Sequence, residues 1–511
     1  MPRSLQLTGL TIKYGFFSFF RSLGLYPHSY PKIARMYLEE AGGALIKMGQ
    51  ILALRYEILP PEYCWELSEL FDNVPPMGYA EVQEIISKEF GKSPHEMFTI
   101  FEDAPIASAS FAQVHRAILP NGKEVAVKVQ RPNLEYKVKK DFRFLRTISP
   151  FLNLMFRMKT LSVRDILFEL EESTLRELDF RLEKDNAEII RKNLPKTNRF
   201  VVPECYSEFT TAKILTQDFI HGTKLTDIMR AKNSNVTNEQ FRDIDFDLDR
   251  IADDIISELG RQYFMVGTYH SDPHPGNIII TNDGKIALVD FGIVGHVTKF
   301  SRSLFWNFIR HIVLDVDAEK AAAAFIRLGS RPIEERVRFL SQDKIQVPDQ
   351  FLQIISELST SFEHPLKSVM DNWDDATGDP STPIYDRSTA VAFIKGMKLA
   401  EQYCVHFQRD LIMFIRTLVI GDMMAMQIAP TFKMKHALVK FAREYPEVVN
   451  EMQERLSHYE IENEKLSDPW NEDARYNAKA YISEWFEDLI DNRPSLYKKI
   501  KPSVLRFRQM L

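Results

Sequence analysis

The 511-residue sequence has only three cysteines, Cys64, Cys205 and Cys404. They are too few and too scattered for a disulfide framework or a thiolate zinc site, which favours a reducing compartment. No run of 18 or more apolar residues is free of charge, because Arg416 divides the best candidate, LIMFIRTLVI. The sequence therefore predicts no membrane-spanning helix. It also predicts no secretory signal, because the N-terminus has no compact apolar core followed by a small-residue cleavage site.

The chain also lacks an excess of positive charge. Its 65 basic and 71 acidic residues give a formal net charge of −6, so no global field would attract nucleic acid. The two ends differ from the rest. Residues 1–38 hold five basic residues and no acid around the aromatic run YGFFSFF, and residues 493–511 hold six basic residues and no acid. Such ends suit a membrane surface rich in anionic lipid, and docked terminal helices with solvated charges are the alternative.

The length and the 45% hydrophobic content are sufficient for more than one core. Changes of pattern along the chain predict four regions: a helical N-terminal extension (1–103), a β-rich lobe (104–220), a helical lobe that contains a polar hairpin (221–440), and a charge-rich helical tail with a basic end (441–511). There is no internal repeat and no low-complexity tract.

Three strand pairs are predicted. FAQVHRAIL and KEVAVKVQ are joined by PNG, and IIITNDGKIALVDFG contains Asn-Asp-Gly, so both stretches have the pattern of a β-hairpin. FVVPECYS and AKILTQDFI fit a third pair of strands. In the N-terminal extension, residues 29–50 have a helical pattern that ends in small residues, and LPPEYCWELSELFDNVPP predicts a helix between prolines.

A single helix is predicted over residues 163–191. The residues at helical spacing that indicate one buried stripe are Leu167, Leu170, Thr174, Leu178 and Leu182. The same stretch carries three acidic residues that return below as candidate partners of a lysine.

The segment HSDPHPGN has two incompatible interpretations. His270 and His274 stand four apart, as metal ligands do on a helix, whereas Asp272 and Asn277 stand five apart, as in a phosphoryl-transfer loop. Prolines on both sides of His274 disfavour a helix, and no third nitrogen or sulfur ligand lies nearby. The pattern therefore favours the phosphoryl-transfer loop.

A phosphoryl-transfer loop requires a second metal-binding carboxylate further along the chain. Asp290 follows Asn277 by thirteen residues, in LVDFG, at the end of an apolar strand. Magnesium prefers oxygen ligands, so Asn277 and Asp290 are its candidate ligands. Asp272 is then left to orient or deprotonate the attacking oxygen.

The same chemistry requires a cation for the nucleotide phosphates. Lys128 lies centrally in the predicted strand EVAVKVQ, on the face opposite to the valines. Its acidic partner is expected among Glu177, Asp179 and Glu183, of which the last two share a helix face. Each of these residues alone is weak evidence, but the ordered set of lysine, helix carboxylates, D-x4-N and DFG is strong evidence for a phosphoryl-transfer site.

With these motifs the chain resembles the protein-kinase-like superfamily, and within it the UbiB family of atypical kinases and ATPases. The resemblance covers residues 44–296 by motif. KMGQ (47–50) looks like the family's K-x-G-Q signature, ASAS (107–110) resembles its alanine-rich nucleotide loop, ELD (177–179) matches its E-x-D element, and HSDPHPGN matches its catalytic loop.

The resemblance implies an α+β, protein-kinase-like bilobal fold, with a helical extension over the active site and a mostly helical C-lobe. It implies ATP and Mg²⁺ as cofactors, with Asn277 and Asp290 as magnesium ligands and Asp272 at the catalytic position. Lys128 would pair with Glu183 and contact phosphate. The remaining implied site residues are Lys47 and Gln50 over the cleft, and Ala107, Ser108, Ala109, Ser110, Glu177 and Asp179 at the nucleotide.

The sequence departs from two patterns. Ser108 interrupts the family's alanine run, and Ala112 stands where many members have glycine. No A-P-E segment follows DFG, because DFGIVGHVTKF leads directly into a helical pattern, and this disfavours a conventional protein kinase. The resemblance assigns His270 to bracing the catalytic loop and His274 to a hydrogen bond near the nucleotide.

The leading hypothesis is a magnesium-dependent ATPase or small-molecule kinase that supports isoprenoid-quinone (ubiquinone-type) or related lipid metabolism. It would associate peripherally with a membrane surface, on the cytoplasmic side or in an organelle matrix, and would not bind nucleic acid. The alternatives are a catalytically silent nucleotide- or lipid-binding scaffold and a conventional protein kinase. The sequence leaves open the oligomeric state. It also leaves open the phosphate acceptor, for which water is one candidate.

Overall fold

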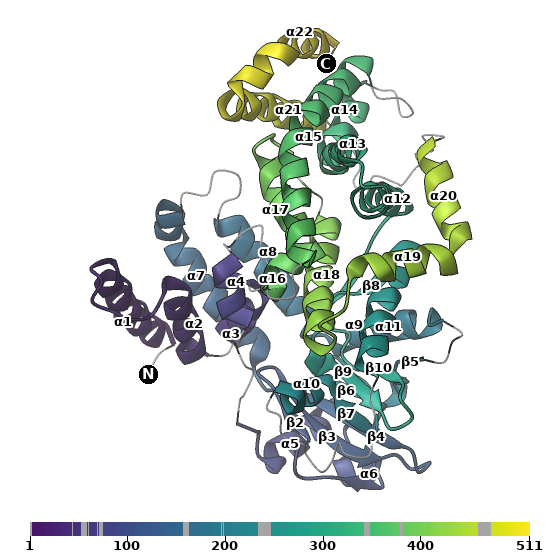
Figure 1. Ribbon diagram of the computed structural model, residues 1–511. Coiled ribbons are helices and arrows are strands. Elements are labelled where there is room, and N and C mark those ends of the chain that lie inside the picture. Colours follow the sequence, from purple (N-terminus) through teal and green to yellow (C-terminus); the bar gives the residue numbers. More distant parts are fainter. Residues whose placement is uncertain are drawn as a thin grey trace. The chain divides into compact units, whose positions relative to one another are not determined.

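The computed structural model divides into two compact units (Figure 1). Unit 1 comprises Met1–Thr223 and Ile279–Ile293, and unit 2 comprises Lys224–Ile278 and Val294–Leu511. The structure describes residues 3–42, 44–52, 59, 61–68, 70, 75–156, 163–195, 197, 199–233, 247–341, 348–378, 382–405, 407, 409–457 and 472–510. Unit 1 holds the larger sheets and unit 2 is mainly helical, so the predicted α+β class is confirmed.

Unit 1 begins with helices and continues into its sheets. Its helices are α1 (Arg3–Ser22), α2 (Tyr30–Ala41), α3 (Ala44–Leu52), α4 (Pro61–Ser68), α5 (Tyr79–Phe90), α6 (Pro94–Met97), α7 (Leu134–Phe156), α8 (Val163–Arg176), α9 (Phe180–Lys192) and the 3₁₀ helix η1 (Ser207–Phe209). Its strands are β1 (Ile100–Phe101), β2 (Ala107–Ser108), β3 (Ala112–Ile118), β4 (Glu124–Gln130), β5 (Phe200–Val201), β6 (Ile214–Asp218), β7 (Gly222–Lys224), β9 (Ile278–Thr281) and β10 (Ile286–Leu288), with one residue of β7 and one of β9 across the boundary.

The first sheet has the order β1-β3-β4-β6, with β2 also paired to β3. β3 and β4 form the predicted hairpin, whose turn uses Gly122 at φ 84°. Val125, Val127 and Val129 point to one side and are fully buried against α5 and α6. Because side chains alternate along a strand, Lys128 lies on the opposite face.

The second sheet has the order β5-β10-β9-β7. β9 and β10 form the predicted hairpin, with Gly284 at φ 76° in its turn. The predicted pairing of FVVPECYS with AKILTQDFI is wrong for β5, because β5 pairs in parallel with β10. Further along the same segment, Cys205 makes an isolated bridge to Gln217 of β6. The hairpin β9–β10 offers β5 an edge at Ile286, and strand pairing of this kind depends on residues distant in sequence.

The helix predicted over residues 163–191 is two helices, α8 and α9, separated at Glu177–Asp179. The break occurs because Asp179 caps α9, its carboxylate accepting a hydrogen bond from the backbone N–H of Arg181 at 3.1 Å. The new helix starts in a different phase. Leu182, expected in the buried stripe, is therefore 45% exposed, and Phe180, Glu183, Ala187 and Ile190 are buried instead.

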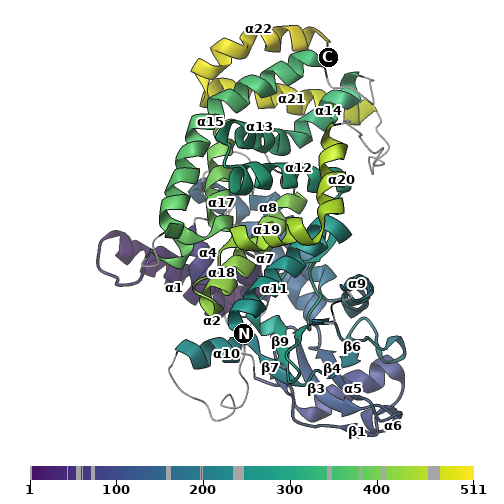
Figure 2. The ribbon, with the colours of Figure 1, turned by 45° about the vertical axis from the view of Figure 1, so that its right-hand side comes forward.

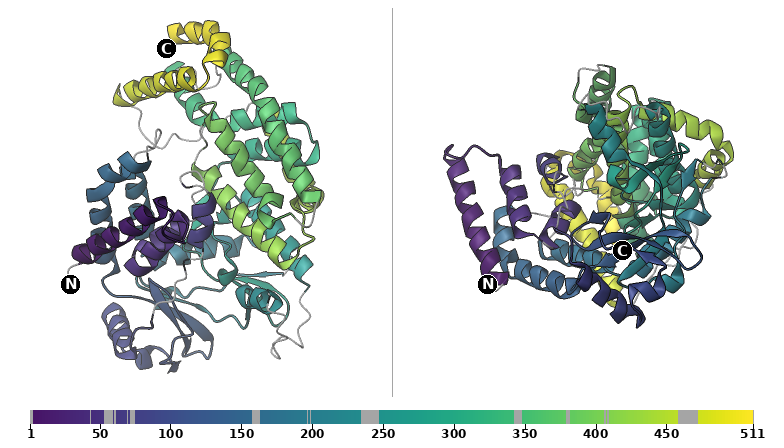
Figure 3. Two further views of the ribbon diagram at one scale, coloured as in Figure 1. Left: turned by 60° about the vertical axis from the view of Figure 1, so that its left-hand side comes forward. Right: turned by 90° about the horizontal axis from the view of Figure 1, so that it is seen from below.

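The helices of residues 3–68 form a second core of unit 1 together with α7 and α8 (Figure 3). The helix predicted over residues 29–50 is interrupted at Gly42, whose φ of 68° ends α2 before α3 begins. Residues 77–101, which the sequence groups with the N-terminal extension, pack on the first sheet through Val82 and Ile86. The extension thus contributes to both cores of unit 1.

Unit 2 is built mainly of helices (Figure 2). Its elements are α10 (Leu225–Asn233), α11 (Leu248–Arg261), the π-helix η3 (Gln262–Val266), β8 (Thr268–His270), the 3₁₀ helix η4 (Pro275–Asn277), β11 (Val294–His296), α12 (Lys299–Ile309), the π-helix η5 (Arg310–Leu314), α13 (Ala318–Gly329), α14 (Arg331–Ser341), α15 (Asp349–Gly378), α16 (Ile384–Arg387), α17 (Thr389–Glu401), α18 (Arg409–Ile428), α19 (Met434–Glu444), α20 (Pro446–Ser457), α21 (Glu472–Asn492) and α22 (Pro494–Met510).

The core of unit 2 is rich in aromatic side chains. Tyr263 stacks on Phe414 with ring centroids 3.5 Å apart, and Phe305 packs edge-to-face on both rings. Phe414 belongs to α18, and within the described residues Leu411–Ile428 is the one window long and apolar enough to cross a membrane. Since 67% of this window is buried within the fold, packing explains its apolar character.

The basic C-terminal end is a docked helix. Leu496, Ile500, Val504 and Phe507 of α22 are buried, and α22 packs on α15. Its basic residues occupy other faces of the helix, so the alternative of a docked helix with solvated charges describes this end of the chain.

Candidate functional site

An ion-paired cluster in unit 1 joins three of the predicted residues. The Lys128 Nζ atom lies 2.9 Å from both carboxylate oxygens of Glu183 and 3.3 Å from Oδ2 of Asp290. β4 delivers the lysine, α9 the glutamate, and the segment after β10 the aspartate. Of the three candidate partners of Lys128, the structure brings Glu183 to it.

The charges in this cluster depend on one another. Burial lowers the pKa of Lys128, but the carboxylates of Asp290 and Glu183 outweigh burial and the net shift is upward, so the lysine is protonated. Burial raises the pKa of Glu183, although the positive charge of Lys128 opposes the shift. Phe180 also places its ring 5.0 Å from the Lys128 ammonium. The result is a fixed positive charge at the position expected for a phosphate contact.

Glu183 lies in the buried stripe of α9, between Phe180 and Ala187. Its side chain is 5% exposed, whereas the Asp290 side chain is 41% exposed. Glu183 is therefore committed to the protein interior. Asp290 retains a solvent-facing side from which it could reach a metal ion.

The segment that carries Asp290 is held by backbone contacts on both sides. Asn186 donates a hydrogen bond to the carbonyl of Phe291 at 3.0 Å, and Gln217 donates one to the carbonyl of Val289 at 3.1 Å. The N–H of Gly292 donates to Oδ1 of Asp290 at 3.0 Å. One carboxylate oxygen of Asp290 is thus used internally and the other lies toward Lys128.

The loop at residues 107–110 is held by an arginine that the sequence analysis missed. Arg131 follows β4 and donates through Nε to the carbonyl of Ala109 at 2.8 Å, and through Nη2 to Oγ of Ser108 at 2.8 Å. Ala107 and Ser108 form β2, and Ser110 is buried. The loop is therefore held by side-chain hydrogen bonds, in addition to its pairing with β3.

The E-x-D element occupies the break between α8 and α9. Asp179 forms a salt bridge with the guanidinium of Arg181 at 2.6 Å, and this contact lowers the pKa of the carboxylate. The carbonyl of Leu178 accepts a hydrogen bond from Gln130 of β4 at 2.6 Å. Glu177 is partly exposed. The hydrogen bond from Gln130 to Leu178 fixes the element next to the strand of Lys128. The contact of the element with nucleotide stays a prediction.

The K-x-G-Q residues Lys47 and Gln50 lie on α3, and their side chains fall outside the described part of the chain. Gly49 between them lies against α2, because a Cβ atom there would overlap the side chains of Leu38 and Leu70. This close approach explains the glycine. The roles predicted for Lys47 and Gln50 remain predictions.

The residues of the predicted catalytic loop belong to unit 2. β8 pairs antiparallel with β11, which fixes the start of the loop at His270, and the loop ends in the 3₁₀ turn η4. The Asn277 amide nitrogen donates to the carbonyl of Asp272 at 3.3 Å and lies 3.5 Å from its carboxylate. Because the amide nitrogen is the donor, the amide oxygen is the atom left to bind a metal.

The two histidines shape this loop. The buried His270 accepts a hydrogen bond on its ring Nδ1 from the backbone N–H of Asp272 at 3.2 Å. The backbone N–H of His270 donates to Oε1 of Gln262 at 2.9 Å. His274 caps η4 and accepts from the N–H of Gly276 at 3.1 Å. The hydrogen bonds of His270 thus brace the loop as expected. Within the described residues no group of three or more His, Cys, Asp or Glu side chains could hold a metal ion.

The connection after DFG is as short as the sequence indicates. Only Val297 and Thr298 stand between β11 and α12, and the Thr298 hydroxyl caps the helix by accepting from the N–H of Ser301. This stretch leaves no room for a long activation segment.

Other residues of the site were not predicted. Asn186 lies three positions after Glu183 on the same face of α9, so helical spacing could have indicated it. Gln262 and Thr417, which contact the backbone of His270 and Ser271, come from η3 and α18 and are distant in sequence from the loop. No sequence pattern of the loop itself points to them.

Comparison with known proteins identifies relatives. A family model described as an ABC1 atypical kinase-like domain matches residues 69–325. An uncharacterized protein of Synechocystis is 32% identical over 306 residues, which cover 58% of this chain and 73% of that protein. The chloroplastic proteins ACTIVITY OF BC1 COMPLEX KINASE 7 and 3 of Arabidopsis thaliana are 33% and 29% identical over 321 and 400 residues.

These matches cover 61% and 78% of this chain, and 44% and 51% of the two Arabidopsis proteins. The chain thus spans about half the length of these relatives. Among solved structures, a complex of a Mycobacterium tuberculosis protein with erythromycin has 26% sequence identity and a TM-score of 0.40, covering 62% of this chain and 81% of that one.

Proposed function

Because the chain belongs to the ABC1 atypical kinase-like family, we propose that it is a magnesium-dependent ATPase or small-molecule kinase. The observation that carries the proposal is the cluster of Lys128, Glu183 and Asp290, in which a buried carboxylate fixes a protonated lysine beside a partly exposed aspartate. A lysine held in this way is suited to binding nucleotide phosphates.

In this mechanism the residues of the chain have separate tasks. Lys128 would hold the α and β phosphates, with Glu183 keeping it in position and charged. Asp272 would orient the attacking oxygen or accept its proton. The loop at residues 107–110 would cover the phosphates, and side chains there would restrict the close backbone approach that a glycine-rich loop allows.

Magnesium would be held by Asn277 and Asp290 and would neutralise charge on the transferred phosphate. The ligand atoms suit the ion, because both are oxygens and the Asp290 side chain is 41% exposed. The two residues belong to different units of the chain, so their joint coordination of one ion is part of the proposal.

The test is phosphate release by the purified full chain with Mg·ATP, with and without anionic liposomes and a phenolic quinone-precursor mimic. We expect turnover that Asp290→Asn abolishes. The matched control is Asp283→Asn, in the turn between β9 and β10, where Asp283 pairs with Lys285. Turnover unaffected by Asp290→Asn would contradict the proposal. Nucleotide binding without turnover in the wild type would indicate a scaffold, and labelling of a bystander protein would indicate a protein kinase.

We also propose that Lys47 and Gln50 act on the nucleotide from the N-terminal extension. Their replacement by alanine should change the turnover or nucleotide selectivity of the full chain, although the motif lies far before Lys128 in sequence. Unchanged kinetics in both variants would rule out this role.

The proposed setting is a membrane surface, with an isoprenoid- or quinone-type lipid as the related metabolite. Its support is α1, which has apolar side chains on two faces. Leu7, Leu10 and Tyr14 are buried against the rest of unit 1. Seven of the seventeen exposed large hydrophobic residues in the described chain lie in the short stretch from residue 5 to 25: Leu5, Ile12, Phe16, Phe19, Phe20, Leu23 and Leu25. Such a face, with basic and no acidic residues in the helix, suits an anionic bilayer.

A further inference from the structure

A buried ion pair lies behind the predicted catalytic loop in unit 2. Arg261 donates through Nε and Nη2 to the two carboxylate oxygens of Glu258, each at 2.7 Å. Glu258 and Arg261 are 3% and 7% exposed, and both belong to the last turns of α11. Moving two charges out of water costs about as much as their attraction returns, so stability alone does not explain a pair at this place.

Gln262 connects the ion pair to the loop. Its side-chain amide donates through Nε2 to Oε1 of Glu258 at 2.9 Å, and its Oε1 accepts from the backbone N–H of His270 at 2.9 Å. The ring Nδ1 of His270 in turn accepts from the backbone N–H of Asp272 at 3.2 Å. A continuous series of hydrogen bonds therefore runs from the ion pair to the residue that is proposed to orient the attacking oxygen.

The two neighbours of the Gln262 side chain require an amide at this position. A carboxylate only accepts hydrogen bonds and a backbone N–H only donates, so the side chain between them must donate on one side and accept on the other. Glutamine does both, whereas a glutamate would turn a second negative charge toward Glu258. Arg261 contacts both oxygens of Glu258, and this two-pronged contact fixes the direction of the carboxylate as well as compensating its charge.

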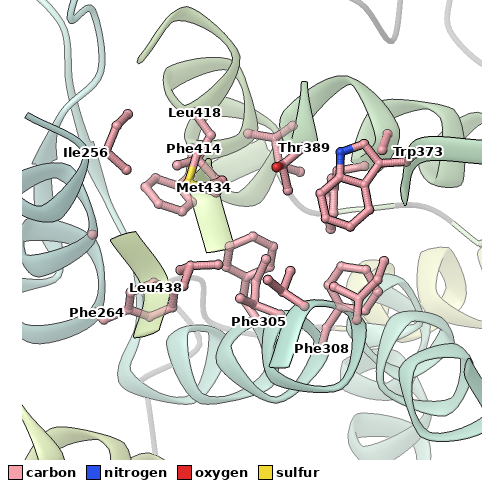
Figure 4. Close-up of a pocket in the computed structure, with 17 residues that line it drawn as sticks. Ile256, Phe264, Phe305, Phe308, Trp373, Thr389, Phe414, Leu418, Met434 and Leu438 are labelled. Atoms are coloured by element: carbon pink, nitrogen blue, oxygen red, sulfur yellow. The ribbon is translucent and has the colours of Figure 1, made fainter. Parts of the chain in front are cut away.

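The backbone of η3 directs Gln262 toward the loop. Gln262 is the first residue of this π-helix, and π-helical turns change the phase of a helix and occur frequently at functional sites. Two positions further on, Phe264 lies with Phe305 and Phe414 around a small apolar cavity whose free volume is about 50 Å³ (Figure 4). The segment is thus anchored in the apolar core through Phe264, while Gln262, which is 1% exposed, bonds to the backbone of the loop.

We infer that Gln262 is a positioning residue of the predicted catalytic loop, held in the required direction by the Glu258–Arg261 pair. It fixes the backbone of His270 and thereby the direction of Asp272. The inference rests on the proposed function, because it gives the residue a part in phosphoryl transfer. Other residues of the chain are proposed to bind the nucleotide, so loss of Gln262 should lower kcat and leave the KM for ATP nearly unchanged.

Gln262→Glu is the direct test, because it keeps the volume and the acceptor toward His270 but loses the donor toward Glu258. We expect kcat to fall about tenfold or more, with the KM for ATP changed by less than about twofold. The swapped variant, Glu258→Gln combined with Gln262→Glu, again places a donor opposite an acceptor at unchanged net charge. It should recover kcat by about threefold or more over the single variant.

Gln402→Glu is the matched control. Gln402 lies in the same unit, at the end of α17, and is exposed. The control variant should keep the kcat and the KM of the wild type.

Amide hydrogen exchange, followed by mass spectrometry, observes the loop of the full chain without relying on turnover. The peptide that contains residues 270–272 should exchange about tenfold faster or more in Gln262→Glu than in the wild type, and the swapped variant should restore part of the protection. If Gln262→Glu fails to fold, as judged by circular dichroism, Gln262→Met replaces it. Methionine has a similar volume and makes neither of the two hydrogen bonds, so the same changes in kcat and in exchange are expected.

Unchanged kcat or unchanged exchange in the Gln262 variant would overturn the inference. An equal loss of kcat in the single and the swapped variants would also overturn it, because the polarity of the two side chains would then not matter. Absence of turnover in the wild type would instead contradict the proposed function, and the exchange rates alone would then decide whether Gln262 holds the loop.

Discussion

At the scale of single residues, Glu183 combines an ionisable side chain with deep burial, which rarely occur together. It lies in the buried stripe of α9, where an apolar side chain would be usual, and its side chain is only 5% exposed. A buried carboxylate is retained when a partner compensates it, and Lys128 supplies two contacts of 2.9 Å. An apolar pair of similar volume would serve folding as well, so the proposed phosphate-binding role gives a reason for the charged pair that stability does not.

Glu183→Gln should therefore lower both stability and turnover. The substitution leaves the Lys128 ammonium with Asp290 alone, and we expect a loss of about 2–3 kcal/mol in the free energy of unfolding. Chemical denaturation measures the loss. Glu188→Gln on the same helix is the control, because Glu188 pairs with Lys184 and Lys192 near the surface and should cost less than about 0.5 kcal/mol. Equal losses in both variants would contradict this account of the cluster.

Arg131 is expected to act on nucleotide affinity through the loop at residues 107–110. Arg131→Lys keeps the charge but loses the fork that donates to Ala109, Ser108 and the carbonyl of Pro75. A looser loop should raise the KM for ATP about tenfold and change kcat less. Steady-state kinetics separate the two constants. A fall in kcat with an unchanged KM would indicate that Arg131 acts on the chemical step instead.

The burial of His115 allows a prediction of how the free energy of unfolding depends on pH. It is fully buried, its Nδ1 donates to the carbonyl of Glu102 at 2.8 Å, and burial lowers its pKa. The folded state thus binds the proton less readily than the unfolded state, whose histidine has a pKa of about 6.5. The stabilising contribution is present above pH 6.5 and is lost as the pH falls below it.

Denaturation at pH 7 and pH 5 tests this dependence. The wild type should lose about 1–2 kcal/mol more than His115→Gln between the two pH values. His95→Gln, at an exposed histidine, serves as the control and should retain the wild-type dependence. An identical pH dependence in wild type and His115→Gln would show that other groups are responsible.

At the scale of elements, local signals predicted local structure. The hairpins β3–β4 and β9–β10 were predictable because each turn contains a glycine at positive φ, Gly122 or Gly284, between apolar strands. The pairing of β5 was not predictable, since its partner β10 follows only after many intervening elements. The break before α9 was missed because the cap at Asp179 competes with a leucine periodicity that continues across it.

The site follows the same rule. Lys128 and Asp290 stand on predicted strands or directly after them, so their positions could be predicted from alternation and motif order. Choosing Glu183 over Asp179 depended on the family resemblance, because both were predicted on one helix, and the cap position of Asp179 before α9 is not visible in the sequence pattern. Arg131 carries no motif, and its role becomes visible only when the loop folds back on β3.

The pairing of β8 with β11 depends on a glycine. Gly295 stands opposite Tyr269, and an added Cβ would overlap the tyrosine ring. Tyr269 is fully buried against Tyr263 and Phe414, so it has little room to move. Gly295→Ala should therefore lower the free energy of unfolding by about 1–3 kcal/mol and reduce turnover, since β8 leads into the catalytic loop.

Thermal melting and phosphate release measure the two effects. Gly15→Ala in α1 is the control, because its Cβ would meet nothing within 4 Å. That variant should be neutral or slightly stabilising, by up to about 1 kcal/mol. A Gly295→Ala protein with wild-type stability would contradict the argument from close packing.

At the scale of the whole molecule, the chain leaves unit 1 and returns to it. Residues 224–278 belong to unit 2, and Ile279–Ile293 then add β9, β10 and Asp290 to unit 1. Asp272 and Asn277 of the predicted catalytic loop come just before this return, and Asp290 comes within it. A short stretch of sequence thus supplies predicted chemical groups to both units.

The two ends of the chain differ in how they would bind the proposed membrane surface. α22 buries most of its large apolar side chains and exposes Leu505 by 48%, whereas α1 exposes Phe16, Phe19 and Phe20 by 59%, 57% and 41%. Apolar burial adds to the attraction between basic residues and anionic lipid, so α1 should dominate binding. The triple change Phe16→Ser, Phe19→Ser and Phe20→Ser should weaken co-sedimentation with anionic vesicles at least tenfold.

The matched variant replaces Lys498, Lys499 and Lys501 of α22 with glutamine. It removes three positive charges from the docked helix and should reduce binding less than the α1 variant does, because each exposed lysine contributes about 1 kcal/mol only if it reaches the surface. Circular dichroism checks that both variants fold. If the lysine variant loses binding and the phenylalanine variant keeps it, charge at the C-terminal helix, and not the apolar face of α1, governs the association.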